Sequence, residues 1–189
     1  MNDAEQLRAA KDMVRAKRFP EARAAFESLS KTGSIEGIDA LYCLAIIHYA
    51  GSGVEQNLDE AIQYFTLAHE RGHVMASYQR GGILEKLGEI ENAYKVFQWA
   101  APHIPAAAHR AYLLLRATSG LDSDPNAGEK YLVMAADQGH VIARRKIAWR
   151  VLSGREGWQK IPYGLFLYAK AAVLIVDAVM IKDDRLKYE

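Results

Sequence analysis

The sequence predicts an all-α fold, an α/α superhelical solenoid of about five helix-turn-helix repeats. Apolar residues recur at three- and four-residue spacing, as along one face of a helix, and no alternating strand pattern stands out. Proline is scarce, with 5 in 189 residues, so helices can run through most of the chain. The segment 40–76 also recurs at 107–143, which is 67 residues later, and such self-similarity is typical of stacked repeats.

Glycines and prolines interrupt the helical pattern and so delimit the expected elements. Breaks fall at Pro20, Gly33, Gly72, Gly120 and Gly139, among others. Gly72 and Gly139 suit the C-terminal ends of helices, where the backbone often turns left-handed. In chain order, the expected helices cover residues 3–17, 20–31, 37–50, 57–71, 74–87, 90–101, 106–119, 124–138, 141–153 and 162–181.

The expected helices pair, and the second helix of a pair carries an alanine followed four residues later by an aromatic. Small alanines let two helices approach closely, while the aromatic side chain fills the groove beside them. One repeat of this kind cannot bury its apolar face alone, so neighbouring repeats must stack. The pattern occurs at Ala22 with Phe26, Ala61 with Phe65, and Ala93 with Phe97.

The first full unit carries a specific set of small and aromatic residues. It reads Ala40-Leu-Tyr42-Cys-Leu44-Ala45, then Gly51-Ser-Gly53-Val54, then Ala61, Tyr64-Phe65, Ala68 and Gly72. This set resembles the Sel-one-like repeat, an α/α variant of the tetratricopeptide repeat with a longer glycine-containing loop. The resemblance divides one solenoid domain, residues 1–189, into a tetratricopeptide-like hairpin at 1–39, repeats at 40–75, 76–106 and 107–142, and a degenerate C-terminal repeat at 143–189.

The resemblance implies a non-catalytic scaffold or adaptor that binds a protein or peptide segment. In solenoids of this type the first helix of each pair lines a concave groove, and aromatics with arginines are enriched at binding hot spots. The alternative is that several tyrosines only fill space between repeats. The expected groove residues are Tyr42, Ile46, Tyr49, Tyr78, Glu85, His109, Arg116, Arg145 and Trp149.

The expected C-terminal helix is unusually apolar, although a terminal repeat should present a polar outer face. Residues 165–181 carry only Lys170 and Asp177 as charges, so another surface must cover this helix. Three covers are considered: self-association or partner docking, folding back on the solenoid, and membrane attachment, for which the helix is short. The docking residues expected on it are Leu165, Phe166, Ala169, Val173, Leu174, Val176 and Met180.

The charge balance argues against a polyanion as the main partner. The chain has 24 basic and 23 acidic residues, which give a net charge of +1, and we expect no nucleic-acid partner. A basic cluster at 144–160 is expected to be a solvated face, and an acidic partner segment is the next interpretation. The lone Cys43 lies in an apolar run and is expected to be buried. With no export signal visible, a cytoplasmic protein is expected, or one peripheral to the inner membrane.

We expect no catalytic residues, no cofactor and no metal. The segment 69–73, His-Glu-Arg-Gly-His, spells the zinc-protease motif, which needs both histidines on one continuous helix. Because Gly72 takes the helix-ending position, we interpret His73 as the residue after a helix stop. A metallohydrolase using His69 and His73 is therefore a remote alternative. A nearer one is a membrane-associated assembly or regulatory factor, for example in envelope or polysaccharide processes, attached through residues 163–181.

Overall fold

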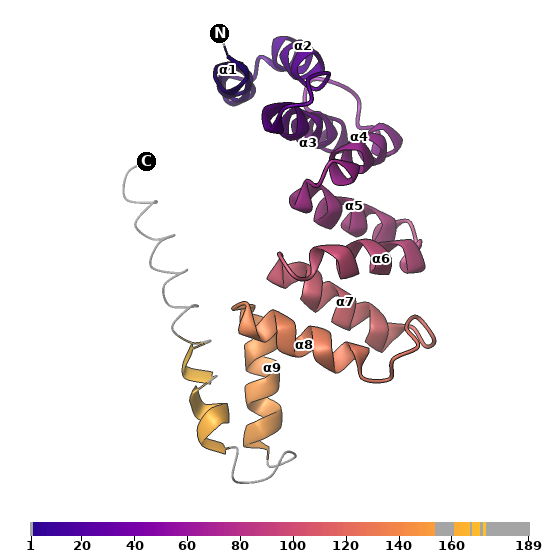
Figure 1. Cartoon of the computed structure of the whole chain (residues 1–189), viewed down its shortest axis with the longest axis vertical. Coiled ribbons are helices and arrows are strands. Elements are labelled where there is room, and N and C mark those ends of the chain that lie inside the picture. The colour runs from indigo at the N-terminus through magenta and orange to yellow at the C-terminus, as the bar shows by residue number, and fades with distance from the viewer. Residues whose placement is uncertain (1, 154–160, 167, 171, 173–189) are drawn as a thin grey trace. The chain divides into compact units, whose positions relative to one another are not determined.

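The computed structural model describes residues 2–153, 161–166, 168–170 and 172, and every regular element among them is an α-helix (Figure 1). The predicted all-α fold is confirmed, and consecutive helices pack as pairs, α1 on α2, α3 on α4 and α7 on α8. Further helical backbone follows at residues 161–166 and 168–170. The helices are α1 (Asp3–Arg15), α2 (Phe19–Leu29), α3 (Ile35–Ala50), α4 (Leu58–Glu70), α5 (Val74–Lys86), α6 (Ile90–Ala100), α7 (Pro105–Ala117), α8 (Ala127–Asp137) and α9 (Val141–Leu152).

The ends of α1 to α9 lie within three residues of the predicted ones, and the start of α8 differs most. The sequence pattern predicts a start at residue 124, but α8 begins at Ala127. Two aspartates before the helix explain the delay. The Asp122 side chain accepts from the backbone N–H of Asp124 (2.9 Å), and the Asp124 side chain accepts from that of Asn126 (2.8 Å). Such side-chain contacts hold the backbone in turns that compete with a helix.

The chain falls into two compact units, Met1–Val96 and Phe97–Glu189, each with its own packed helices. In the N-terminal unit, Ala22 and Phe26 of α2 are fully buried, as are Ala61 and Phe65 of α4. The predicted pairing of a small residue with an aromatic one is therefore confirmed in both hairpins. Because alanine has no side chain beyond its β-carbon, the facing helix can lie close and the phenylalanine ring fills the adjacent space.

In the C-terminal unit, α7, α8 and α9 pack in sequence around a core that includes Tyr112, Leu132 and Ile147. The helical segment at residues 161–166 packs on α9 through Gly164, which is buried. A β-carbon at Gly164 would lie 3.0 Å from Cγ1 of Val151, so only glycine allows this approach without a shift. The described start of the C-terminal segment thus lies against α9 of its own unit.

Two glycines end helices in the same way in the two units. Gly72 follows the end of α4 with a φ of +90°, and Gly139 follows the end of α8 with a φ of +99°. The next residue, His73 or His140, begins the following helix, since its Nδ1 accepts from the backbone N–H three residues further on (3.0 and 3.3 Å). A side-chain acceptor at this position satisfies one of the free N–H groups of a helix start. The predicted helix stop at Gly72 is confirmed.

Candidate functional site

In the N-terminal unit, Tyr42, Ile46 and Tyr49 occupy one face of α3, because they are four and then three residues apart. All three are half-buried and pack against the cluster formed by α3, α4 and α5. Tyr42 and Ile46 line a pocket of about 380 Å³ that α1 completes. The Tyr49 hydroxyl accepts a hydrogen bond from Lys86 Nζ of α5 (2.8 Å). The structure therefore gathers the first three predicted groove residues on one partly open face of α3. The pocket that Tyr42 and Ile46 line on this face is called the α3 pocket.

The cations at the α3 pocket are already paired within the protein. Lys11 Nζ lies 3.2 Å from Oδ2 of Asp39, and Arg15 lies 2.6 Å from the carboxylate of Asp12. The remaining lining is largely apolar and includes Cys43, which is partly buried. Burial raises the pKa of the Cys43 thiol to about 11, so the side chain stays neutral. This pocket offers an apolar floor with little unbalanced charge.

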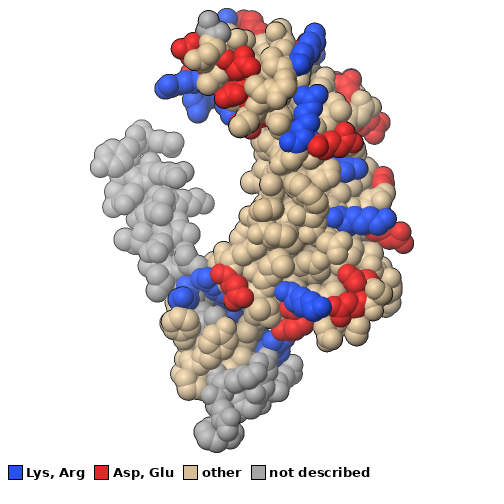
Figure 2. Space-filling view, in the orientation of Figure 1, with Lys and Arg blue, Asp and Glu red and all other residues tan. Residues whose placement is uncertain are grey.

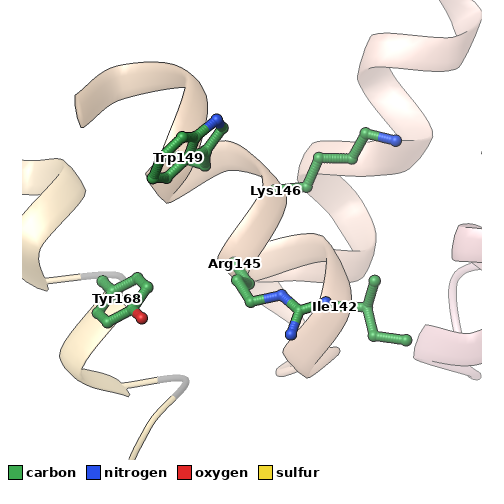
Figure 3. Close-up of a pocket in the computed structure, with 5 residues that line it drawn as sticks. All are labelled: Ile142, Arg145, Lys146, Trp149 and Tyr168. Atoms are coloured by element: carbon green, nitrogen blue, oxygen red, sulfur yellow. The ribbon is translucent and has the colours of Figure 1, made fainter. Parts of the chain in front are cut away.

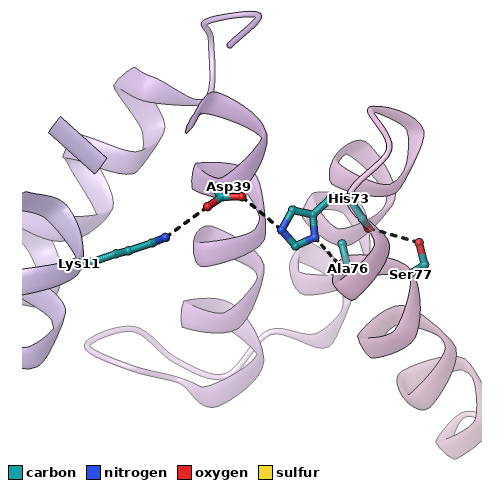
Figure 4. Close-up of polar contacts among 5 residues, drawn as sticks. All are labelled: Lys11, Asp39, His73, Ala76 and Ser77. Atoms are coloured by element: carbon teal, nitrogen blue, oxygen red, sulfur yellow. Dashed lines mark hydrogen bonds and ion pairs between the residues drawn. The ribbon is translucent and has the colours of Figure 1, made fainter. Parts of the chain in front are cut away.

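Asp39 also connects the α3 pocket to the start of α5 (Figure 4). Its Oδ1 lies 3.4 Å from Nε2 of His73, whose other ring nitrogen caps α5. Because Nδ1 accepts, the neutral ring carries its proton on Nε2 and donates it toward the carboxylate. Burial lowers the pKa of His73 and Asp39 partly offsets this, so the neutral form prevails near pH 7. Lys11, Asp39 and His73 therefore tie α1, α3 and α5 together.

The residues 69–73 match the zinc-protease motif in sequence, but their two histidines do not lie on one continuous helix as the motif requires. His69 lies on α4, whereas His73 caps α5 beyond the helix stop. Nδ1 of His69 lies 2.7 Å from the Ser77 hydroxyl, and both ring nitrogens of His73 have partners. Among the described residues, no group of three His, Cys, Asp or Glu side chains is placed to hold a metal ion.

In the C-terminal unit, the predicted groove residue His109 takes the position that Tyr42 has 67 residues earlier. Its ring stacks on His140 with centroids 4.3 Å apart, as the ring of Tyr42 stacks on His73 at 4.5 Å. Burial, the neighbouring His140 and nearby Lys146 lower the pKa of His109 to about 4. The same ring-on-ring contact thus joins the first helix of one repeat to the start of the first helix of the next, α3 to α5 and α7 to α9.

Arg116, also predicted for the groove, is exposed at the end of α7 and donates from Nη1 to the Tyr112 hydroxyl (3.1 Å). Leu113, which corresponds to Ile46 in the repeat, is also exposed and was not among the predicted groove residues. Leu113 lies 67 residues after Ile46, so alignment of the two repeats identifies it as a groove position. Tyr78 and Glu85 of α5 are half-buried and line neither the α3 pocket nor the pocket on α9 described next.

Arg145 and Trp149 lie four residues apart on α9 and line one pocket of about 410 Å³ (Figure 3). Trp149 is 72% exposed, the largest exposure of any aromatic side chain among the described residues. The pocket is completed by Ile142 and Lys146 of α9 and by Tyr168 of the following helical segment. We call this surface the α9 pocket. Sequence reasoning missed Tyr168, although it lies in the apolar stretch that was singled out as a docking helix.

Within the basic cluster predicted at 144–160, some described cations bind acceptors in the protein, whereas Arg145 has no carboxylate partner among the described residues. Nε of Arg144 donates to the Ala136 carbonyl oxygen (2.7 Å), and Arg150 makes two hydrogen bonds of 2.6 Å to the carboxylate of Glu129. These two arginines tie α9 to α8. In the part of the chain that the structure describes, no carboxylate pairs with Arg145. The cluster is therefore only partly available to a partner.

The predicted docking helix is described over its first turns only. Leu165 and Phe166 are 57% and 53% exposed, and Ala169 is exposed. Val173, Leu174, Val176 and Met180 lie outside the described residues. No helix within the described ranges is both long and apolar enough to cross a membrane.

Comparisons with known proteins identify the repeat. The model of the Sel1 repeat family matches residues 38–73 and 104–140, which confirms the predicted resemblance in the first and third repeats. A search of curated proteins found no match. The chain is similar in structure to a Sel1 repeat protein from Oxalobacter formigenes, with a TM-score of 0.73 and 21% identity over 90% of this chain and 73% of that one.

Two further solved structures share the fold. The protective antigen c5321 of uropathogenic Escherichia coli, described as displaying an SLR fold, gives a TM-score of 0.69 at 17% identity and covers 91% of this chain. This chain spans only 38% of that antigen. MamA from Desulfovibrio magneticus RS-1 gives a TM-score of 0.53 at 18% identity, over 94% of this chain and 97% of that one. The chain therefore carries Sel1 repeats at residues 38–73 and 104–140 and folds as a Sel1-like α-solenoid.

Proposed function

We propose that the protein is a non-catalytic scaffold that binds segments of partner proteins on the exposed faces of α3 and α9. Sel1 repeat solenoids generally act as protein-interaction scaffolds. The observation that carries the proposal for this chain is Trp149, which lies open to solvent beside Arg145 on the first helix of its repeat. Tryptophan and arginine are the residue types that dominate binding hot spots, and a tryptophan exposed to this degree often belongs to an interaction site.

The α3 pocket supports the same function in the N-terminal unit. Tyr42 and Ile46 present an apolar surface, and the cations at its edge are neutralised within the protein. Such a surface suits an apolar side chain of a bound segment better than a charged one, because burying an unpaired charge costs free energy. The two pockets thus offer a partner different chemistry.

The start of the C-terminal helix supports a second part of the proposal, in which this helix docks a partner or another copy of the chain. Leu165 and Phe166 are more than half exposed on adjacent positions of a helix whose Gly164 faces α9. Apolar side chains gathered in this way favour an interface over a solvated surface. A location in the cytoplasm or at the inner membrane surface belongs to this proposal as well.

Position-specific photo-crosslinking in the native cell tests the scaffold function. A photoreactive phenylalanine analogue replaces Ile46 in the α3 pocket or Trp149 in the α9 pocket. Leu67 on α4 and Val133 on α8 serve as matched controls, because they are exposed apolar side chains on the second helices of the first and third repeats. We expect discrete protein adducts from the two pocket positions and not from the controls. Adducts of equal yield at all four positions, or none at the pocket positions, would refute the proposal.

A further inference from the structure

We propose that the α9 pocket binds an acidic segment of a partner protein that places one aromatic side chain beside a carboxylate. The inference rests on the proposed scaffold function and specifies its partner. It follows from the pocket's shape, from its aromatic lining and from two cations that the described part of the chain leaves without a carboxylate.

The aromatic lining comes from two different segments. Trp149 projects from α9 and Tyr168 from the helical segment after it, and the two rings face the same space (Figure 3). Tyr168 is 49% exposed and Ile142, at the other end of the pocket, is 51% exposed. The volume of about 410 Å³ is within the range of pockets that bind ligands. A planar side chain inserted between the rings would cover apolar area on both and gain the preferred offset or edge-to-face contacts.

The charge of the pocket is positive and uncompensated. Arg145 has no carboxylate partner among the described residues, and Lys146 Nζ lies over the ring of Tyr112 at 4.7 Å rather than against an acid. Two other cations of the same unit do have acids, in the pair of Arg150 and Glu129 and the pair of Lys130 and Asp124. In Figure 2, Lys and Arg side chains gather near the start of α9, next to a small acidic patch and above an uncharged surface.

A carboxylate suits this arrangement. Arginine binds a carboxylate through two parallel hydrogen bonds. Lys146 follows Arg145 on α9 and adds to the positive potential of the pocket from its place over Tyr112. Because the pocket is open to water, the charges mainly select the partner and speed its approach, whereas the aromatic contact supplies most of the affinity.

A second copy of the chain fits this pocket less well. A two-fold contact through the same patch would bring Arg145 and Lys146 toward the same residues of the other copy, and like charges at an interface oppose association. Nucleic acid also fits less well. Sites for single strands follow the backbone with several cations, but Arg144 and Arg150 of this helix are bound to Ala136 and Glu129.

Fluorescence anisotropy with the full chain and blocked, labelled peptides of about ten residues tests the proposal. The main probe is a glycine-serine peptide whose centre is Asp-Glu-Phe-Asp-Glu. One control peptide has serine in place of phenylalanine, and another has lysine in place of every acid. We expect the main probe to bind at least about tenfold more tightly than either control, and more weakly as the salt rises from about 50 to about 300 mM.

Variants assign the binding to the pocket. Trp149→Ala and Arg145→Glu should each weaken binding of the main probe by about tenfold or more, whereas Lys95→Glu, at an exposed position of α6, should leave it unchanged. Circular dichroism shows whether each variant keeps its helices. Trp149→Phe retains an aromatic ring and should therefore keep most of the affinity for the main probe.

Several results would overturn the inference. These are no binding of the main probe up to about 1 mM, equal binding of the lysine peptide, or tighter binding of a uridine oligonucleotide. A dimer in light scattering that Trp149→Ala dissolves would assign the pocket to a second copy instead. If the peptide fails but crosslinks still form at position 46, the scaffold function stands and only this partner assignment fails.

Discussion

Replacing Gly53 with alanine should destabilise the first Sel1 repeat far more than the equivalent change destabilises the other one. Gly53 lies in the loop between α3 and α4 with a φ of +70°, and Gly120, 67 residues later, has a φ of +77°. A β-carbon at Gly53 would lie 2.4 Å from Cβ of Phe19, whereas one at Gly120 would have nothing within 4 Å. Comparing Gly53→Ala with Gly120→Ala therefore separates the effect of backbone strain from that of a steric clash.

The expected magnitudes follow from these two terms. A left-handed backbone costs a residue with a β-carbon about 1–2 kcal/mol, and both variants incur this cost. Only Gly53→Ala must also push Phe19 away, and since the contact is with Cβ the start of α2 must move with it, which adds about 1–3 kcal/mol. We expect losses of about 1–2 kcal/mol for Gly120→Ala and about 2–5 kcal/mol for Gly53→Ala.

Hydrogen exchange resolved by segment measures the two effects where they occur, because solenoids do not always unfold in one step. Protection should fall in residues 19–50 for Gly53→Ala and only slightly in residues 105–137 for Gly120→Ala. Asparagine tolerates a left-handed backbone, so Gly120→Asn should recover stability while Gly53→Asn should not. Equal losses in the two alanine variants would show that the contact with Phe19 is unimportant.

Three further predictions concern titrating groups. His109→Tyr reproduces the ring pair of Tyr42 and His73; because the pKa of His109 is about 4 when folded and near 6.5 when unfolded, the wild type should lose stability relative to this variant as pH falls from 6.5 toward 4. The full shift corresponds to about 3 kcal/mol, and since solvent screens the half-buried ring we expect a loss of about 1 kcal/mol in the free energy of urea unfolding. Glu129→Gln should lower the free energy of unfolding by less than about 1 kcal/mol at pH 7. Because the Arg150 hydrogen bond lowers the pKa of Glu129, this difference between wild type and variant should vanish as pH falls through that pKa. Cys43, with its pKa near 11, should react with iodoacetamide at pH 8 about a hundredfold more slowly than a free cysteine peptide.

The positions of the helices could be predicted from the sequence because each helix is determined by residues within or next to it. Spacing of apolar residues sets the face of a helix, and glycine at a left-handed position, such as Gly72, sets its end. The start of α8 was missed because Asp122 and Asp124 bind backbone N–H groups that a helix would otherwise use, and this competition depends on geometry rather than on apolar spacing.

The candidate site was predictable where the repeat places a residue and not where distant residues meet. Tyr42, Ile46, Arg145 and Trp149 were found from their register in the repeat, and the structure shows each of them lining a pocket. The contribution of Tyr168 to the α9 pocket requires knowing how the segment after α9 packs. That packing depends on the approach of Gly164 to Val151, a contact between side chain and backbone that no local pattern encodes.

The two Sel1 repeats show which positions maintain the fold and which are free to carry function. Positions that set helix packing hold the same residue in both, as with Ala68 and Ala135, which are fully buried. The predicted groove positions differ: Tyr42 becomes His109, and Tyr49 becomes Arg116. A residue needed only to fill space between repeats would be expected to recur with the framework around it. His109 is neutral near pH 7 and stacks on His140 as Tyr42 stacks on His73, so the first exchange keeps a packing role. The exchange of Tyr49 for the charged and exposed Arg116 on an unchanged framework favours a role in partner selection at that position.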